Sequence, residues 1–419
     1  MNIKNKVRSP ILLFILMLFG IELFLRLPYV LNVQANPYLN RKADLSYFSD
    51  FNSGTVIFTG LMLLACAFVV VSITAFFNKG MNYSTIEIPI PKIPIFISII
   101  ALILSGVSLY MISQVTADIG YTDDFDISGK RSFSDDRFLY AILKLSMFNH
   151  IVIALAYVRS VQTKGVFAWI CFIIPTLVFG LTLTFISHRA LLFVFVLEIL
   201  YFQILLKRLN LRRLMIVAIA LIIVLLTITV LRTNQEHANL FEAFGAGISK
   251  ALESRIFFDF TKLGVGYLWS TEINWLGPVS ISFLFEPFFN TDIVFYRDLG
   301  KILARDGYNI HVDSGITPGG YLEALLSFGV IGGGIFLGLI VYIFLFFERR
   351  LFEKNSAFVF KAYSVMVLSK VALFLNSSFG AFCFQLVVES LLFMVIIWPF
   401  IGLNYRSSRT RYQSHKINI

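Results

Sequence analysis

Three arginines give this sequence its clearest chemical signal. Arg189 opens an apolar stretch directly after Ser187 and His188. Arg232 follows another apolar stretch, and Arg255 belongs to an amphipathic segment. A guanidinium group at a membrane surface is costly unless it meets an anion, and such groups stabilise negative charge that develops on a leaving group. The three arginines are therefore candidates for binding a phosphate or pyrophosphate, and pairing with lipid phosphate is the alternative for each.

A second group of candidates surrounds the predicted start of a helix near residue 318. Thr317 followed by Pro318 is a typical helix start, because threonine caps the first turn and proline fits its first position. The N-terminus of such a helix attracts anions. His311 lies just upstream and Glu323 lies about one and a half turns in, so either could take a proton from a hydroxyl group. In the alternative interpretation, His311 is an ordinary loop histidine and Glu323 pairs with an arginine.

No sequence signature indicates a bound metal or nucleotide. The sequence lacks a Walker A loop, a His-Glu-x-x-His motif, a Gly-x-Ser-x-Gly motif and clustered histidines or cysteines. The cysteines Cys66, Cys171 and Cys383 lie inside apolar stretches without paired spacing. We therefore expect no metal and no cofactor.

The composition places these residues in a membrane protein. Of 419 residues, 58% are apolar and 14% are charged, against roughly 45–50% and about 25% in soluble domains. A soluble globular protein is thereby excluded. The net charge of +10 would fit a nucleic-acid partner, but the basic residues gather at the ends of the apolar stretches. We expect membrane lipids as neighbours and no nucleic acid.

Stretches of about 20 apolar residues predict an all-α polytopic membrane protein with about ten transmembrane helices. The predicted spans cover residues 10–33, 54–77, 93–113, 138–158, 165–186, 189–206, 214–231, 318–347, 357–376 and 380–401. Basic residues concentrate in alternate connections, which indicates that both termini lie in the cytoplasm. A cleaved signal peptide over residues 1–35 is the alternative interpretation of the first span.

The spans divide the chain into three parts. Residues 1–231 hold seven predicted transmembrane helices with short loops, and residues 318–419 hold three more and a basic cytoplasmic tail. Between them, residues 232–317 form a large outer loop, which is too long for a simple connector and too aromatic for a disordered linker. Apolar residues at three- and four-residue steps between Phe241 and Phe260 predict an amphipathic helix in this loop, lying on the membrane surface.

Charged residues also fall inside the predicted spans, where they need partners or a watery cavity. Glu22 and Arg26 are four residues apart and can pair within one helix. The sequence assigns no partner to the others, which are Lys144, Glu198, Lys361, Lys370 and Glu389.

A run of glycines follows Glu323 in the eighth predicted span. It consists of Gly329, Gly332, Gly333, Gly334 and Gly338. Small residues at such spacing allow close approach of another helix. We interpret the run as a packing surface, with a hinge as the alternative.

In these features the sequence resembles the bacterial oligosaccharide repeat-unit polymerases, the Wzy-type enzymes of O-antigen and capsule assembly, and more distantly the O-antigen ligases. The resemblance covers the layout of the whole chain. Its sharpest local pieces are Ser187-His188-Arg189, the large outer loop, and the stretch from Gly319-Gly320-Tyr321-Leu322-Glu323 to Gly332. The resemblance implies a GT-C-like fold in the bacterial cytoplasmic (inner) membrane and a reaction without metal or nucleotide.

The reaction implied by the resemblance is transfer of a growing glycan from an undecaprenyl pyrophosphate carrier to another lipid-linked repeat unit. The implied partners are undecaprenyl-pyrophosphate-linked oligosaccharides and a chain-length regulator protein. Matching positions assign Arg189, Arg232 and His311 to the site. We hypothesise that Arg189, together with Arg232 or Arg255, binds the pyrophosphate. Glu323 or His311 then takes the proton of the acceptor hydroxyl.

Other functions stay open at this point. A lipid-linked oligosaccharide flippase or another transporter would use charges inside the spans, such as Lys144, Lys370 and Glu389, although the sequence shows no repeated halves. An O-antigen ligase would fit the layout, but the His-Asn pair of the ligases is absent after the outer loop. A membrane acyltransferase would need a clearer set of intramembrane histidines than His150 alone.

Overall fold

The computed structural model describes residues 90–119, 137–185, 189–206, 320–353, 356–376 and 379–401. Within these ranges the chain is helical and contains no strand. Five of the described helices are long and apolar enough to cross a membrane. The described part of the chain is therefore that of an all-α protein with membrane-spanning helices, as the sequence predicts.

The described residues belong to two compact units. The first contains residues 320–347, 371–376 and 379–385. The second contains residues 90–119, 137–185, 189–206, 348–353, 356–370 and 386–401. Both units combine segments that are far apart in the sequence. The three-part division by sequence order stays a prediction.

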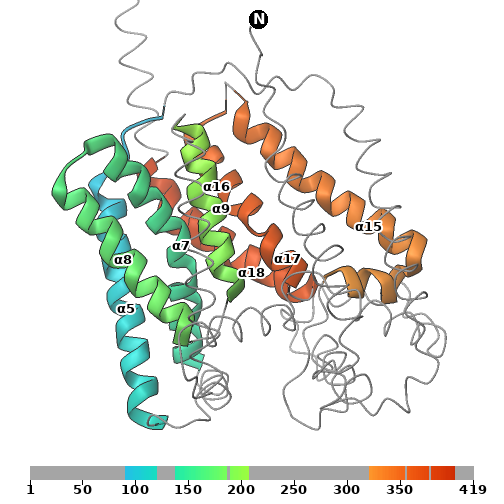
Figure 1. Ribbon diagram of the computed structural model, residues 1–419, viewed down its shortest axis with the longest axis horizontal. Helices are drawn as coiled ribbons and strands as arrows, with labels where there is room; N and C mark the ends of the chain where they lie inside the picture. The colour runs from blue at the N-terminus through green and yellow to red at the C-terminus, as the bar shows by residue number, and fades with distance from the viewer. Residues whose placement is uncertain are drawn as a thin grey trace, which may run out of the picture. The chain divides into compact units, whose positions relative to one another are not determined.

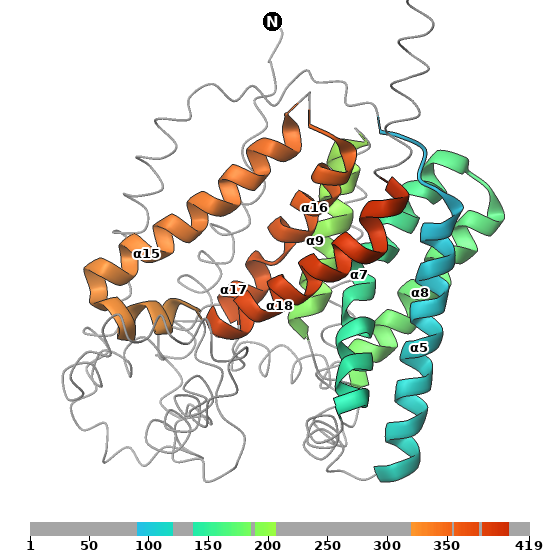
Figure 2. The same ribbon diagram turned by 180° about the vertical axis from the view of Figure 1, so that it is seen from behind.

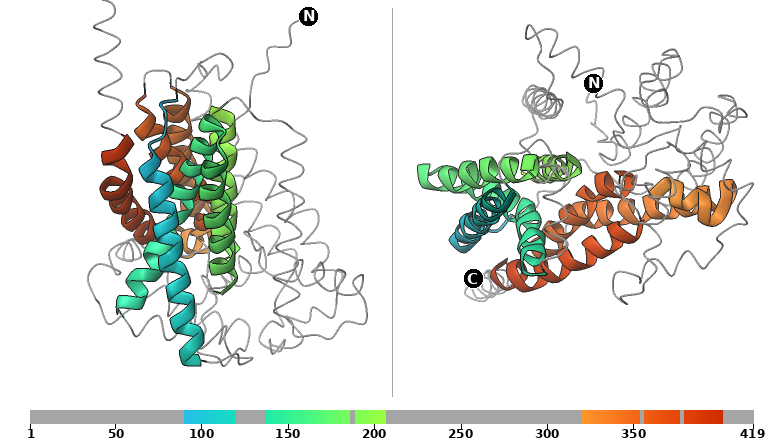
Figure 3. Two further views of the ribbon diagram at one scale, coloured as in Figure 1. Left: turned by 90° about the vertical axis from the view of Figure 1, so that its left-hand side faces the viewer. Right: turned by 90° about the horizontal axis from the view of Figure 1, so that it is seen from below.

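Four helices from the middle of the chain build most of the second unit (Figure 1). They are α5 (Ile95–Ile119), α7 (Arg137–Thr163), α8 (Val166–Phe185) and α9 (Arg189–Leu205). Helix α7 contacts the other three, and α5 also packs on α8. The helices run side by side in Figure 3, and their bounds agree with the spans predicted from apolar stretches.

Helix α7 is the core of the second unit, whereas α8 lies at its surface. From Ile151 to Ala156, every side chain of α7 is fully buried. Large apolar side chains of α8 are exposed, among them Val166 (77%) and Leu177 (67%). Exposed side chains of this size and chemistry are expected on a helix that faces lipid.

A tight turn and a side-chain clamp join three helices at one end of the second unit. Lys164 ends α7 with a positive φ of 54°, and its N–H donates to the carbonyl of Ser160 at 2.9 Å. Gln162 hydrogen-bonds the backbone before α5, because its Oε1 accepts from Ile93 N–H at 2.9 Å. Arg159 donates to the carbonyl of Ile93 at 2.6 Å. These basic residues lie at the end that the sequence assigns to the cytoplasm.

The second unit is completed by segments from the C-terminal part of the chain. Helix α16 (Phe358–Ser369) packs on α9, as seen from behind in Figure 2. Helix α18 (Phe379–Leu392) contributes its second half, which continues into the π-helical turn η5 (Phe393–Ile397). The last turn of α15 also belongs here, because the hydroxyl of Tyr201 donates to Oε1 of the buried Glu348 at 3.0 Å.

The first unit contains most of α15 (Gly320–Phe352), together with α17 (Val371–Asn376) and the start of α18. Helix α15 bends sharply at Gly329, whose φ of 70° and ψ of −170° favour glycine. Phe344, Phe374 and Phe382 pack edge to face in this unit, with ring centroids 5.5–6.4 Å apart.

The bend in α15 explains the glycine run. A Cβ atom on Gly333 would lie 2.7 Å from the carbonyl oxygen of Ala324, nine residues earlier in the same helix. The first turns of α15 therefore fold back on its own later turns, and packing and bending occur together. The run does serve close packing here, but against its own helix, and Gly329 supplies the bend.

Seven predicted spans fall on described residues, and all seven are helical. The span predicted at 357–376 is divided between α16 and α17. The spans predicted at 10–33, 54–77 and 214–231, and the outer loop 232–317, lie outside the described residues.

Candidate functional site

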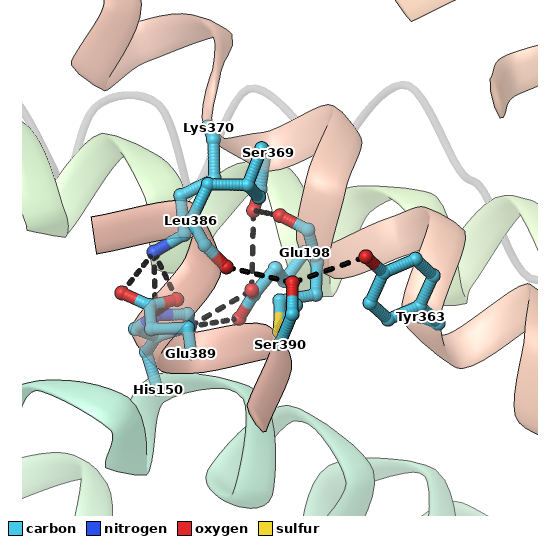
Figure 4. Close-up of polar contacts among 9 residues, drawn as sticks. His150, Glu198, Tyr363, Ser369, Lys370, Leu386, Glu389 and Ser390 are labelled. Carbon is cyan, nitrogen blue, oxygen red and sulfur yellow. Dashed lines mark hydrogen bonds and ion pairs between the residues drawn. The ribbon is translucent and has the colours of Figure 1, made fainter. Parts of the chain in front are cut away.

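Four ionisable side chains and one serine meet in the interior of the second unit (Figure 4). This set is called here the His150 cluster, and it consists of His150 of α7, Glu198 of α9, Ser369 at the end of α16, Lys370 directly after it, and Glu389 of α18. None of the ionisable side chains is more than 3% exposed. Charged groups this deep in an apolar bundle are costly unless they pair with one another.

Three members of the cluster lie several turns from the first residue of their helices. At 1.5 Å per residue, Glu198 is roughly 13 Å from the start of α9 and Glu389 is about 15 Å from the start of α18. His150 is about 20 Å from either end of α7. The three side chains therefore share one depth, near the middle of the spans predicted from the sequence.

The imidazole ring of His150 connects two carboxylates that come from different helices. Its Nδ1 atom lies 2.8 Å from Oε1 of Glu198. Its Nε2 atom lies 3.2 Å from Oε2 of Glu389. The hydroxyl of Ser369 donates to Oε1 of Glu198 at 3.1 Å. These contacts fix the orientation of the ring, because both of its nitrogens are engaged.

Lys370 completes the cluster and contacts both Glu389 and His150. Its Nζ atom donates to Oε1 of Glu389 at 2.7 Å and forms an ion pair with Oε2 of the same carboxylate. Nζ also lies 2.9 Å from Nε2 of His150. The ammonium, the ring nitrogen and the carboxylate are therefore mutually in contact, which joins α7, α18 and the end of α16.

Two irregular stretches of backbone border the cluster. Helix α16 ends at Ser369 and α17 begins at Val371, so a one-residue turn at Lys370, whose backbone keeps right-handed helical angles, interrupts the predicted span 357–376. The π-helical turn that begins at Phe393 lies four residues after Glu389. Broken helices and π-helical turns are frequent at the ion and substrate sites of membrane proteins. This backbone pattern favours a functional site over a simple packing contact.

Further polar groups lie around the cluster. Lys144 is half-buried on α7, six residues before His150, and interacts electrostatically with Glu389. Tyr363 of α16 and Ser390 of α18 share a hydrogen bond of 3.0 Å beside the cluster (Figure 4). Among the described residues, no group of three or more His, Cys, Asp or Glu side chains could hold a metal ion. The imidazole and carboxyl groups of the His150 cluster are side chains that can bind and release protons.

Two of the five site residues predicted from the sequence fall on described residues, and neither belongs to the His150 cluster. Arg189 is the first residue of α9, in the second unit. Glu323 lies in the first turn of α15, in the first unit, and its side chain is buried. His311, Arg232 and Arg255 lie outside the described residues. The joint role of these five residues stays a prediction.

Sequence reasoning missed the cluster, although it identified most of its members. It recognised Glu198, Lys370 and Glu389 as buried charges without partners and treated His150 as isolated. The signal that could have found the cluster is the similar position of its members along their predicted spans. His150, Glu198 and Glu389 each lie between roughly 13 and about 20 Å from the first residue of their helices, which all run in the same predicted direction.

Comparison of the chain with protein-family models, with curated proteins and with solved structures found no match. The functional interpretation therefore depends on the residues of this chain.

Proposed function

We propose that the chain is a membrane glycosyltransferase that polymerises undecaprenyl-pyrophosphate-linked oligosaccharide repeat units into a surface polysaccharide at the outer face of the cytoplasmic membrane. The observation that carries the proposal is the position of Arg189. This arginine is the first residue of α9, and three residues separate it from the end of α8. Arg189 therefore stands at the connection of two apolar helices, which is the outer surface of the membrane in the predicted orientation.

A fixed cation at that level suits the chemistry of the proposed reaction. The acceptor hydroxyl oxygen attacks the anomeric carbon of the donor glycan, and the bond from that carbon to the pyrophosphate oxygen breaks. The pyrophosphate leaves with the electron pair, so negative charge grows on it. Arg189, with Arg232 or Arg255, stabilises this charge in place of a metal ion. The proton of the acceptor hydroxyl passes to Glu323 or His311.

The shape of α15 supports a role for its first turns. The bend at Gly329 separates residues 320–328 from the apolar stretch Phe328–Phe352, which is long enough to span a membrane. Glu323 therefore belongs to a short helical segment before the span, and not to the span itself. In the predicted orientation this segment precedes the span on the outer side, which supports a role for Glu323 in the proposed reaction.

The proposal is tested in bacteria by deleting the gene and locating the lipid-linked repeat units. A polymerase defect leaves single units that have crossed the membrane and accumulate unjoined at the outer face. Expression of the wild-type chain restores polymer, and expression of the Arg189→Ala variant at the same level does not. Units that remain on the cytoplasmic face would contradict the proposal.

The His150 cluster favours a second candidate, a transporter of lipid-linked oligosaccharide. Ionisable groups at a helix break in the middle of a membrane bundle are typical of proton-coupled transport. The same deletion experiment separates the two functions, because loss of a transporter holds the units at the cytoplasmic face.

A further inference from the structure

We propose that the His150 cluster is a proton-binding site, in which Nε2 of His150 takes up one exchangeable proton and shares it with Oε2 of Glu389. This inference goes beyond the proposed glycan transfer, in which the cluster has no role, and it does not depend on that transfer. It rests on the contacts at one ring nitrogen, on the balance of charge around it and on the backbone that surrounds it.

The contacts at Nε2 of His150 cannot all be hydrogen bonds with a single placement of protons. The atom lies 2.9 Å from the Lys370 ammonium, which can only donate, and 3.2 Å from a Glu389 oxygen, which accepts when ionised. An unprotonated Nε2 accepts from Lys370 and faces the carboxylate with a lone pair. A protonated Nε2 donates to Glu389 and faces the ammonium with an N–H group.

The two arrangements differ by one proton. In the first, the ring is neutral with its proton on Nδ1, which donates to Glu198, and Lys370 donates to Nε2 and Glu389. In the second, the ring is an imidazolium that donates to Glu198 and Glu389 at the same time. Lys370 then keeps its own contacts with Glu389. Both partners of the added proton are already in position, so its uptake needs no rearrangement of helices.

The charges that face the cluster come from a small number of helices. Within the described residues, α5 up to Gln114 and α8 bring no charged side chain to it, and α9 brings Glu198. Helix α18 brings Glu389, Lys370 follows α16, and α7 adds Lys144 at a greater distance. With a neutral ring, the cluster alone carries one net negative charge, and Lys144 balances it. The imidazolium form makes the cluster neutral without Lys144. The His150 imidazolium and the Lys144 ammonium can therefore each neutralise the same negative charge.

Two polar side chains of α7 that lie between Lys144 and His150 in the sequence have unused hydrogen-bonding atoms. Ser146 lies about one turn before His150 on α7, and Asn149 directly precedes His150 in the sequence. In the part of the chain that the structure describes, the hydroxyl of Ser146 takes part in no hydrogen bond and Oδ1 of Asn149 accepts none. Lys144 is six residues from His150, about 9 Å along the helix axis in the direction of the predicted outer end.

The experiment uses the full-length chain, purified in detergent and labelled with ¹⁵N-histidine. The chain has five histidines, and the variant His150→Gln identifies the resonances of this ring. Spectra are recorded between about pH 5 and about pH 9, a range around the ordinary titration of histidine. The expected result is a ring protonated on Nδ1 at high pH that gains a proton on Nε2 as the pH falls.

Four variants distinguish proton binding from a purely structural role. Lys370→Met and Lys144→Met each remove a cation, so the ring should bind its proton about tenfold more tightly or better in both. Glu389→Gln removes the charge that stabilises the imidazolium and should weaken proton binding by a similar factor. Tyr363→Phe is the matched control, because it removes a hydrogen bond between the same pair of helices but no charge.

Opposite changes in the lysine and glutamate variants, with an unchanged control, would establish the proton site. Lys144→Met keeps the test decisive if a variant inside the cluster does not fold, because Lys144 is only half-buried. A ring that keeps one protonation state across the whole pH range would overturn the proposal. So would a control that changes the titration as much as Glu389→Gln does.

Discussion

Nε2 of His150 lies 3.2 Å from Oε2 of Glu389, although 239 residues separate the two along the chain. The contact ties the central helix of the second unit to the last predicted span. It also brings a titratable ring into a region where every ionisable group needs a partner. The consequences for stability, topology and activity can each be measured.

Removing the Glu389 carboxylate should destabilise the protein strongly. In Glu389→Ala, Lys370 and His150 lose their shared acceptor, and an unpaired buried cation typically costs about 3–5 kcal/mol. The control is Glu353→Ala, because Glu353 is 45% exposed and its ion pair with Arg350 is screened by solvent. Thermal unfolding of the purified chains measures both. Equal midpoints for the two variants would show that the contacts at Glu389 contribute nothing to stability.

The fold-back of α15 makes Gly333 sensitive to a single methyl group. In Gly333→Ala, the added Cβ would lie 2.7 Å from the carbonyl of Ala324, so the backbone must shift, at a cost of about 1–3 kcal/mol. Gly106 is the matched control in α5, because a Cβ there meets no atom within 4 Å. Gly106→Ala should leave stability unchanged or raise it by up to about 1 kcal/mol. Thermal unfolding measures the stability of both variants. A Gly333→Ala variant as stable as the wild-type chain would show that the first turns of α15 do not pack on Gly333.

The helices were predictable because long apolar stretches in a membrane protein leave the backbone few choices. The apolar stretch 138–158 predicted α7, and the helix continues five residues beyond that stretch, to Thr163. The pairing of His150 with Glu198 and Glu389 was not predictable in this way, because it depends on which helices become neighbours. The break at Lys370 has no local signal either, since neither glycine nor proline stands between Ala362 and Asn376.

The glycine run in α15 is a second case in which the sequence predicted close packing but not the packing partner. Its composition predicted close packing, and Gly333 does pack closely, but on Ala324 of its own helix. A sequence pattern of small residues does not say which surface approaches them. That surface was set by the positive φ of Gly329, which no spacing rule reveals.

Orientation in the membrane is a prediction that labelling can test directly. The native cysteines are first replaced by alanine, and single cysteines are then introduced by Lys164→Cys and Ser187→Cys. These positions flank α8 at its two ends. A membrane-impermeant thiol reagent added to intact cells should label position 187 and leave position 164 unlabelled until the membrane is opened. The reverse pattern would place Arg189 on the cytoplasmic side and remove it from the proposed site.

Arg189 should be needed for polymer formation and not for folding. Arg189→Ala should lower the amount of polymer by at least about 100-fold, as expected for loss of a group that stabilises charge in a transition state. Arg189→Lys keeps the charge but loses the bidentate geometry, so partial activity is expected. Arg350→Ala is the control, because Arg350 is exposed and pairs with Glu353. Gel analysis of surface polysaccharide measures all three, and full-length polymer in Arg189→Ala would exclude this arginine from the reaction.

The most direct measurement is the size of the glycan made by the purified chain. Lipid-linked repeat units are isolated from the deletion strain and incubated with wild-type protein in lipid vesicles, without nucleotide and with a metal chelator present. The proposed function predicts a ladder of products, each longer than the last by one repeat unit, that does not form with Arg189→Ala. Units that stay single in the presence of correctly folded wild-type protein would contradict the proposed function.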